Sequence, residues 1–258
     1  MYMSKKKILI TGTNSGLGKY LVKAYKCYGL DRKTNINLIK KKKWKLIIHC
    51  ASNKNKINLK NINNSQLIND NILLSKTISK LSGKKIYISS IEVYREIKNN
   101  KSLDEKTKIN IDNTNNFYAK CKLISEKFFL QDKHSLVLRL GSIIGPYMKD
   151  NNATKILKKK KITLSKDSML SYVHYSEIKK FIDLAYLKNL TGIYNFLRND
   201  YISLAKISGL LKIKIKFGNH KFTIVKASNK KISKYIKLKR YSSADILKQL
   251  QNKNLKNN

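Results

Sequence analysis

Proline and cysteine are both scarce in this chain of 258 residues, which has one proline, Pro146, and three cysteines. Cys27, Cys50 and Cys121 are odd in number, and no two of them stand in a C-x-x-C spacing. This arrangement argues against a disulfide scaffold or a zinc site and is typical of a reducing compartment. We therefore predict a cytoplasmic protein without a metal centre.

Long apolar runs are missing too. No stretch approaches the roughly 20 residues that a membrane-spanning helix needs, so we predict no membrane span. The basic start at residues 5–7 is followed by only three apolar residues, 8–10, before a threonine and a glycine. That stretch is too short for the apolar part of a signal peptide and is better explained as a first β-strand.

Acidic residues are few: 15 Asp and Glu stand against 56 Lys and Arg, which gives a formal net charge of +41. Such a charge is typical of a protein that binds nucleic acid or another anionic surface. Lysine supplies nearly all of it, however, and is spread along the chain with abundant Asn and Ile, whose codons are also rich in A and T. Because no arginine-plus-aromatic motif is present, we favour compositional bias over a nucleic-acid partner, although bias does not explain the shortage of acids.

Apolar and amphipathic stretches alternate along the first half of the chain. Strands are predicted at residues 6–11, 27–31, 44–50, 84–90 and 136–140, and helices at 17–25, 65–81 and 117–131. This alternation predicts an α/β fold, with a doubly wound parallel sheet covered by helices on both faces. We expect residues 1–145 to form this domain. Residues 146–258 are predicted to form a smaller, interleaved α+β lobe, with helices at 176–187, 203–211 and from 242.

A glycine-rich turn follows the first predicted strand, with glycines at positions 12, 16 and 18. Such a turn lets the backbone approach a pyrophosphate, and the helix beginning there offers unpaired N–H groups and the positive end of its dipole. Asp31 closes the second predicted strand, where an acid accepts hydrogen bonds from the ribose hydroxyls of NAD. Arg32 and Lys33 follow directly and suit the 2′-phosphate of NADP. The sequence thus predicts a dinucleotide cofactor, NAD or NADP.

Tyr118 and Lys122 stand four positions apart in a predicted helix and therefore share one face. A phenol, with a pKa of about 10, is a poor base at neutral pH. An ammonium group beside it lowers that pKa, so that the tyrosine can exchange a proton with an alcohol or ketone. A serine-bearing strand end, Ser89-Ser90, lies upstream of the pair. The pattern alone is common in a lysine-rich chain, but together with the glycine turn it favours a catalytic site.

The order and spacing of these segments resemble those of the extended short-chain dehydrogenase/reductase superfamily, in its nucleotide-sugar epimerase, dehydratase and reductase branch. The matching segments are residues 10–18, 48–52, 87–94, 117–122 with Glu126, 139–146, 172–174 and 192–195. The resemblance implies a Rossmann-type sheet with a C-terminal substrate lobe. It also implies an NAD(P)-dependent oxidoreductase or epimerase for nucleotide-activated sugars, of the kind that serves surface polysaccharide biosynthesis. The alternative is a non-catalytic Rossmann-fold protein that binds nucleic acid or senses dinucleotide.

The same resemblance assigns roles to residues. Tyr118 is expected to exchange the proton, Ser90 to hold the reacting oxygen, and Lys122 to bond the nicotinamide ribose. Expected cofactor contacts are Gly12, Asn14, Ser15, Gly16, Leu17, Gly18, Asp31, Arg32, Ala51, Ser52, Tyr118 and Lys122. Expected substrate contacts are Ser90, Glu92 and Arg198. Arg198 is included because arginine is rare here and its guanidinium can donate two hydrogen bonds to one phosphate. A homodimer through the Tyr118 helix and its predecessor is implied as well.

Some positions depart from the family pattern. The glycines follow G-x-x-x-G-x-G, and the link between the second and third predicted strands is curtailed. Arg95 occupies a position that is commonly glycine. Ile91 lies where dehydratases often carry an aspartate, which makes dehydration the least favoured of the three reactions. His49, within a strand, and His174, just before a helix capped by Ser176, are interpreted as structural.

Overall fold

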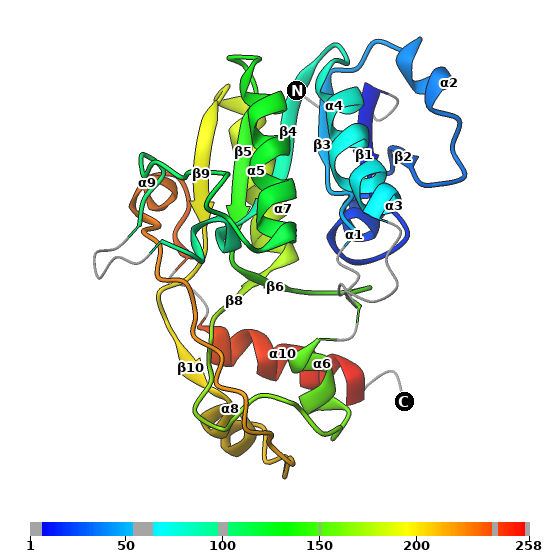
Figure 1. The fold of residues 1–258 in the computed structure, drawn as a ribbon. Helices are drawn as coiled ribbons and strands as arrows, with labels where there is room; N and C mark the ends of the chain where they lie inside the picture. Colours follow the sequence, from blue (N-terminus) through cyan, green and yellow to red (C-terminus); the bar gives the residue numbers. More distant parts are fainter. Residues whose placement is uncertain (1–6, 54–63, 98–102, 150, 239–241, 256–258) are drawn as a thin grey trace.

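The computed structural model describes residues 7–53, 64–97, 103–149, 151–238 and 242–255 (Figure 1). Its centre is a six-stranded sheet in the order β2-β1-β3-β4-β5-β9, in which every neighbouring pair is parallel. The strands are β1 (Ile8–Thr11), β2 (Tyr28–Leu30), β3 (Leu46–His49), β4 (Lys84–Ser90), β5 (Leu136–Leu140) and β9 (Gly192–Phe196). The predicted parallel sheet is confirmed, and β4 and β5 begin and end at the predicted residues.

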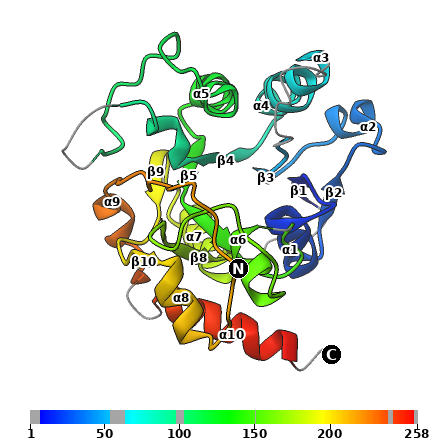
Figure 2. The ribbon, with the colours of Figure 1, turned by 60° about the horizontal axis from the view of Figure 1, so that its bottom comes forward.

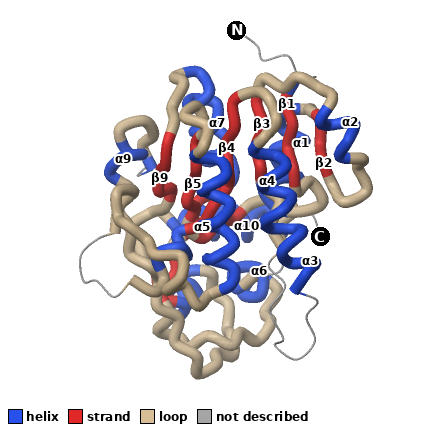
Figure 3. Tube along the Cα trace, turned by 45° about the horizontal axis from the view of Figure 1, so that its top comes forward, coloured by secondary structure: helices blue, strands red, loops and turns tan. Residues whose placement is uncertain are grey.

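Helices cover both faces of this sheet (Figure 3). Helices α4 (Leu74–Ser79) and α5 (Phe117–Leu130) lie on one face, and α1 (Gly16–Tyr25) and α7 (Tyr175–Leu187) lie on the other. Along β3, Leu46 and Ile48 pack in the core beneath α1 and α7, whereas Ile47 packs with Phe129 of α5. Successive side chains of a strand point to opposite faces, so a strand covered on both sides is apolar throughout.

β1 lies between β2 and β3 in the sheet. The connection from β1 to β2 therefore runs towards one edge of the sheet, and the connection from β2 to β3 runs back in the opposite direction. Helix α1 packs on one face through Leu21, and the short α2 (Ile36–Lys40) packs on the other through Ile39. In open α/β sheets a ligand binds outside the carboxyl ends of the strands, at the point where this direction reverses. The topology therefore places a binding site next to the end of β1.

The predicted helix 65–81 consists of three joined segments. They are α3 (Asn64–Ile68), the π-helical turn η2 (Asn69–Leu73) and α4. A single π-helical turn inserted in an α-helix changes which side chains face the neighbouring elements and is frequent at functional sites. Here it carries Asp70 and Asn71, and both make contacts at the edge of the sheet.

A second apolar core lies beyond the carboxyl ends of the strands, at the bottom of Figure 1 and towards the viewer in Figure 2. It includes the predicted helices α8 (Leu204–Leu210) and α10 (Ser243–Leu255), together with α6 (Asn152–Leu157). Two strand pairs accompany them: β6 (Ser142–Ile144) with β8 (Tyr172–His174), and β7 (Met169–Leu170) with β10 (Ile202–Ser203). The chain returns to the main sheet in α7 and β9, so residues 192–195, matched to the lobe by resemblance, form a sheet strand.

Two short elements complete the described chain. Helix α9 (Lys230–Ser233) packs against β9, with Ile232 in the main core. The 3₁₀ turn η3 (Ile91–Tyr94) follows β4 directly. None of the helices in the described ranges combines the length and the apolar composition that crossing a membrane requires.

A buried ion pair joins α5 to β5. The guanidinium of Arg139 donates to both carboxylate oxygens of Glu126, with the shortest contact 2.6 Å, and the two residues are 4% and 3% exposed. Ser89 Oγ donates to the same carboxylate at 2.5 Å, and Arg139 Nη1 donates to the Tyr94 hydroxyl at 2.6 Å. Burial alone lowers the pKa of Arg139, but the hydrogen bonds and charge of Glu126 raise it above its ordinary value. The ion pair ties the end of β4 to α5 and β5.

We expect Arg139→Met to lower the free energy of unfolding by about 3–5 kcal/mol, because Glu126 is then left as an uncompensated buried charge. Urea denaturation monitored by circular dichroism measures this. The double variant Glu126→Leu, Arg139→Met removes both charges and should recover most of the loss. A single variant that loses less than about 1 kcal/mol, the range of exposed pairs, would contradict a tightly buried pair.

Candidate active site

A cleft of about 980 Å³ runs along the carboxyl ends of β1, β3, β4 and β5. Its volume is near the upper end of the range of about 300–1,000 Å³ found for small-molecule sites. Residues 170, 172, 222 and 224 of the smaller lobe line its other side. The predicted residues that line it are Gly12, Asn14, Ser15, Gly16, Leu17, Gly18, Asp31, Arg32, Ala51, Ser52, Ser90, Glu92, Tyr118 and Lys122.

The glycine turn brings α1 into direct contact with the end of β1. A β-carbon on Gly18 would lie 2.2 Å from the carbonyl oxygen of Gly12, and Gly12 itself has a φ of +73°. Only glycine is accommodated at such positions without strain. Gly16, Leu17 and Gly18, in the first turn of α1, therefore lie directly at the cleft. The N–H of Gly16 donates to the carbonyl of Tyr147 at 2.6 Å, and the next N–H groups of a first helical turn have no partner within the helix. This cradle fits the diphosphate of a dinucleotide.

A chain of buried hydrogen bonds fixes the backbone beside this turn. The N–H of Ala51 donates to Thr11 Oγ1 at 3.1 Å, and Thr11 Oγ1 lies 2.7 Å from His49 Nδ1. The other ring nitrogen, Nε2, lies 2.9 Å from Ser75 Oγ, which donates to the carbonyl of Asn71. Every group in the chain is satisfied when the imidazole is neutral and carries its proton on Nε2. His49 is structural, as expected, and holds β3 to β1 at the cleft.

Asn71 holds the segment after β3, and sequence reasoning did not identify it. Its side-chain oxygen accepts from the N–H of Asn53 at 2.8 Å, and its amide donates to the carbonyl of Asn53 at 3.2 Å. Ser52 Oγ also contacts that oxygen, at 3.4 Å. The run Asn69-Asp70-Asn71 in the middle of a predicted helix is unfavourable on helix propensity, and that conflict is the sequence signal that could have identified it.

The opposite end of the cleft is formed by the turn after β2. Asp31 Oδ1 accepts from Thr34 Oγ1 and from the N–H of Lys33, each at 2.9 Å. These hydrogen bonds, with that of Thr34 the larger effect, lower the pKa of Asp31. The adjacent Arg32 also lines the cleft, but its guanidinium donates to Asp70 Oδ2 at 2.7 Å. An ionised carboxylate therefore lies where the ribose hydroxyls of a dinucleotide are expected.

Ser90, Tyr118 and Lys122 all line the cleft. Ser90 ends β4, and its Oγ accepts the N–H of Glu92 at the start of η3. Tyr118 lies in the first turn of α5, which Asn116 caps by accepting the N–H of Ala119. One turn later, Lys122 Nζ lies 5.7 Å from the centre of the Tyr118 ring.

The ammonium group of Lys122 is almost entirely buried. The residue is 5% exposed, and Nζ donates to the carbonyl of Ile88 at 2.8 Å. Burial, followed by the nearby charge of Lys122, lowers the pKa of His49 to about 3. Burial raises the pKa of the Cys50 thiol to about 12, an effect that Lys122 partly opposes. Neither His49 nor Cys50 is therefore suited to carry a proton or act as a nucleophile at neutral pH.

Glu92 lines the cleft but is engaged by Arg95. Both carboxylate oxygens accept hydrogen bonds from the Arg95 guanidinium, at 2.7 and 2.8 Å. The same guanidinium donates to the carbonyl of Thr223 and lies 4.9 Å from the centre of the Phe222 ring. Sequence reasoning did not identify Phe222, because it lies in an irregular segment without a recognisable pattern. Arg95 thereby connects the strand end at Ser90 to the smaller lobe.

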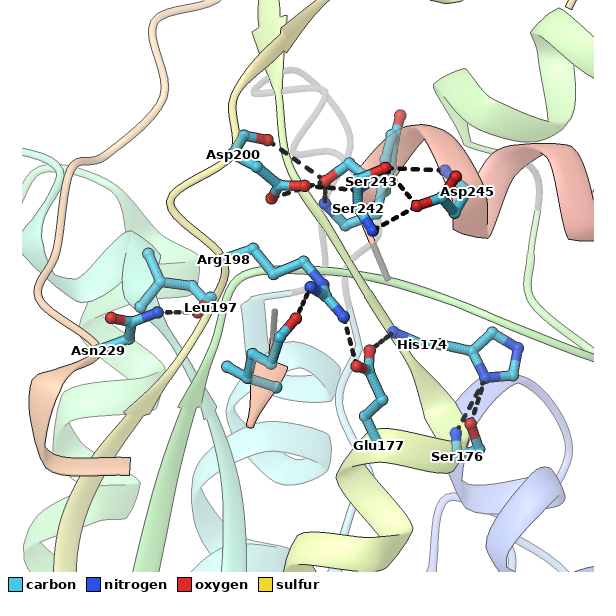
Figure 4. Close-up of polar contacts among 12 residues, drawn as sticks. His174, Ser176, Glu177, Leu197, Arg198, Asp200, Asn229, Ser242, Ser243 and Asp245 are labelled. Atoms are coloured by element: carbon cyan, nitrogen blue, oxygen red, sulfur yellow. Dashed lines mark hydrogen bonds and ion pairs between the residues drawn. The ribbon is translucent and has the colours of Figure 1, made fainter. Parts of the chain in front are cut away.

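The prediction that Arg198 contacts substrate is corrected by the structure, since Arg198 is not among the residues that line the cleft. Its side chain is 4% exposed and donates to the Glu177 carboxylate and the carbonyl of Leu238 (Figure 4). Burial raises the pKa of Glu177, which also accepts from the backbone N–H of His174 at 3.0 Å. His174, and not Ser176, caps α7, because its ring accepts the N–H of Ser176. Both Arg198 and His174 hold the start of α7 in place.

The described residues include no group of three or more His, Cys, Asp or Glu side chains placed to hold a metal ion. The polar groups of the cleft are instead hydroxyls and amides, the cations Arg32, Lys122 and Lys149, and the separate carboxylates of Asp31, Asp70 and Glu92. This set suits an organic anion with hydroxyl groups better than a metal ion.

We expect acid to destabilise the protein partly through His49. The unfolded chain takes up a proton as the pH falls through about 6.5, whereas folded His49 does so only near pH 3. Between these values the unfolded state binds more protons, so the free energy of unfolding decreases as the pH falls. Urea denaturation from pH 4 to 6 should give the wild type a slope up to about 1.4 kcal/mol per pH unit steeper than His49→Gln. Equal slopes would contradict this, and His134→Gln, at an exposed position, is the control.

Comparison with known proteins assigns the chain to a family. No curated protein matches the sequence. Among solved structures, dTDP-4-dehydrorhamnose reductase from Bacillus anthracis, in complex with NADP, is 20% identical, with a TM-score of 0.79 over 97% of this chain and 100% of that one. dTDP-glucose 4,6-dehydratase from the same organism, in complex with NAD, is 17% identical, with a TM-score of 0.76 over 98% and 97%.

A variant of UDP-glucuronic acid 4-epimerase from Bacillus cereus, in complex with a fluorinated UDP-sugar and NAD, is 15% identical, with a TM-score of 0.75 over 96% of this chain and 99% of that one. At these identities the likeness shows the fold. The sequence itself matches the model of the NAD dependent epimerase/dehydratase family over residues 8–195, most of its length. The chain belongs to the NAD dependent epimerase/dehydratase family.

Proposed function

We propose that this protein is an NAD(P)-dependent oxidoreductase or epimerase that acts on a nucleotide-activated sugar. One observation carries the proposal: the glycine turn and the trio Ser90, Tyr118 and Lys122 line the same cleft. Membership of the family and the printed descriptions of the similar structures, which name reductase, dehydratase and epimerase activities on nucleotide sugars, support it. By analogy, the product would serve surface polysaccharide biosynthesis.

The cofactor would lie along the strand ends. The N-terminus of α1 and the glycine turn would hold its diphosphate, Asp31 its adenosine ribose, and Lys122 its nicotinamide ribose. Ala51 and Ser52, held by Thr11 and Asn71, would lie alongside it. When bound, the nicotinamide supplies or accepts a hydride, and the protein contributes the geometry and the proton.

Ser90, Tyr118 and Lys122 would together carry out proton transfer at the oxygen of the reacting sugar carbon. Tyr118 Oη gives a proton to the oxygen of a ketone, or takes one from a hydroxyl, as the hydride moves. The buried ammonium of Lys122 stabilises the phenolate, since a charge acts more strongly where water is excluded. Ser90 Oγ holds the reacting oxygen beside Tyr118 through a hydrogen bond. The bond from Lys122 to the carbonyl of Ile88 keeps the ammonium in this position.

Reduction or epimerisation is favoured over dehydration. Elimination of water requires an acid and a base in addition to the hydride chemistry. Ile91, where an aspartate would serve, is apolar and 4% exposed. Its neighbour Glu92 is engaged through both oxygens by Arg95. This leaves Tyr118 as the proton-transfer group of the cleft in our proposal.

The nucleotide sugar would enter from the side of the smaller lobe. The apolar Phe222 and Ile224 line that side, together with the cation Lys149. An apolar wall beside a positive charge suits a sugar and base linked by a diphosphate.

We extend the proposal to a homodimer, because three large apolar side chains of α3, η2 and α5 are exposed. Ile68, Leu73 and Leu130 expose 38%, 48% and 38% of their surface.

We expect Tyr118→Phe to lower turnover of nucleotide 4-ketohexoses by about 10²–10⁴-fold, the usual contribution of general acid–base catalysis. The dissociation constant for NADH, measured by cofactor fluorescence, should change little because the ring is kept. Tyr201→Phe, outside the cleft, is the matched control. Full turnover by Tyr118→Phe would contradict the mechanism. Salt-dependent retention on RNA without nicotinamide binding would favour a nucleic-acid protein, and cofactor binding without turnover a dinucleotide sensor.

We expect Gly18→Ala to weaken NADH binding by at least about tenfold, because backbone atoms of Gly12 occupy the place of the new methyl group. Gly209→Ala is the control, since nothing lies within 4 Å of the position that its β-carbon would take. The control should bind NADH like the wild type. Equal affinities of Gly18→Ala and Gly209→Ala for NADH would show that the glycine turn does not hold the cofactor.

A further inference from the structure

We propose that Asp70 sets the cofactor preference of this cleft, by holding Arg32 away from the position of a 2′-phosphate and so favouring NAD(H) over NADP(H). The inference rests on the proposed function, since it needs a nicotinamide dinucleotide in the cleft. By sequence, Asp31 suits the ribose hydroxyls of NAD, whereas Arg32 suits the phosphate of NADP. The structure distinguishes the two residues by what each one contacts.

Arg32 is the arginine that would have to receive the phosphate, and it already has an anionic partner. Its Nη2 atom lies 2.7 Å from Asp70 Oδ2. Asn53 Nδ2 donates to the same oxygen at 2.8 Å. Asp31, Arg32, Asn53 and Asp70 all line the cleft. The ion pair of Arg32 and Asp70 therefore lies at the end of the cleft where the adenosine of the cofactor would bind.

The position of Asp70 is fixed by the π-helical turn that carries it. In that turn the next residue, Asn71, accepts the N–H of Asn53 through its side chain and the hydroxyl of Ser125 through its carbonyl. These contacts tie η2 to the segment that follows β3 and to helix α5. Asp70 is 24% exposed and Arg32 is 69% exposed. The carboxylate is thus the anchored partner, and the arginine is the one that would have to move.

The charges at this corner disfavour a 2′-phosphate. The carboxylate of Asp31 has its pKa lowered by hydrogen bonds from Thr34 and Lys33 and is ionised at neutral pH. A free ribose 2′-hydroxyl donates to such a carboxylate, whereas a phosphate is repelled by it. With Asp70 present, the phosphate meets a second carboxylate and must break an ion pair to reach Arg32. Exposed ion pairs are weak and screened by salt, so the preference is a matter of degree.

The test is a fluorescence titration with NADH and with NADPH at one ionic strength, on the wild type and three variants: Asp70→Asn, Arg32→Ala and the double variant. We expect the wild type to bind NADH more tightly. Asp70→Asn should shift the ratio of the two dissociation constants towards NADPH by about three- to tenfold. Arg32→Ala should remove that gain in the double variant while changing NADPH binding by less than about twofold in the wild-type background. Asp167→Asn, which makes the same charge change at an exposed position in the lobe, is the control.

Three results would overturn the inference while leaving the proposed function intact. They are a wild type that prefers NADPH, an Asp70→Asn variant whose ratio equals that of Asp167→Asn, and a gain that persists without Arg32. Binding of neither cofactor would overturn the proposed function itself and the inference with it. Arg32→Ala alone provides a second reading if Asp70→Asn fails to fold, because a large loss of NADPH affinity in that variant would show that Arg32 is already available to the phosphate.

Discussion

The candidate site depends on the parallel pairing of four strands that end at one edge of the sheet. β1 and β3 are aligned so that Thr11 faces His49, and β4 and β5 so that Ser90 faces Leu140. The segments that follow these four strands therefore lie at the same cleft. The glycine turn, the segment 50–53 and the serine strand end meet there although they are far apart in sequence. Helix α1 contributes its first turn to the cleft, and α5 contributes Tyr118 and, one turn later, Lys122.

Two buried polar clusters hold this edge in place. The neutral His49 links β1, β3 and α4 through Thr11 and Ser75. The pair of Glu126 and Arg139 links α5 and β5 and also binds Ser89, the neighbour of Ser90. Buried polar groups are costly unless satisfied, and satisfied networks specify one arrangement. The cleft is thus positioned by groups that do not themselves face the cofactor or substrate.

Local patterns in the sequence predicted the sheet, the glycine turn and the pair of Tyr118 and Lys122, because period and spacing are encoded by near neighbours. Resemblance to the family added Ser90 as a third candidate. Contacts between distant segments could not be predicted in this way. Because arginine is rare in this sequence, we predicted that Arg198 binds a phosphate. Its partners in the structure, Glu177 and Leu238, are distant in sequence and are brought to it only by the fold. Asp70 opposite Arg32 is a contact of the same kind, created by the π-helical turn.

The most direct test of the central claim is to follow a hydride. The protein is incubated with NADH deuterated at C4 of the nicotinamide and with a panel of nucleotide 4-ketohexoses. The masses of the product sugars are then measured by mass spectrometry. Our account predicts a product that carries one deuterium on the former carbonyl carbon. Bound NADH that transfers no deuterium to any member of the panel would contradict it.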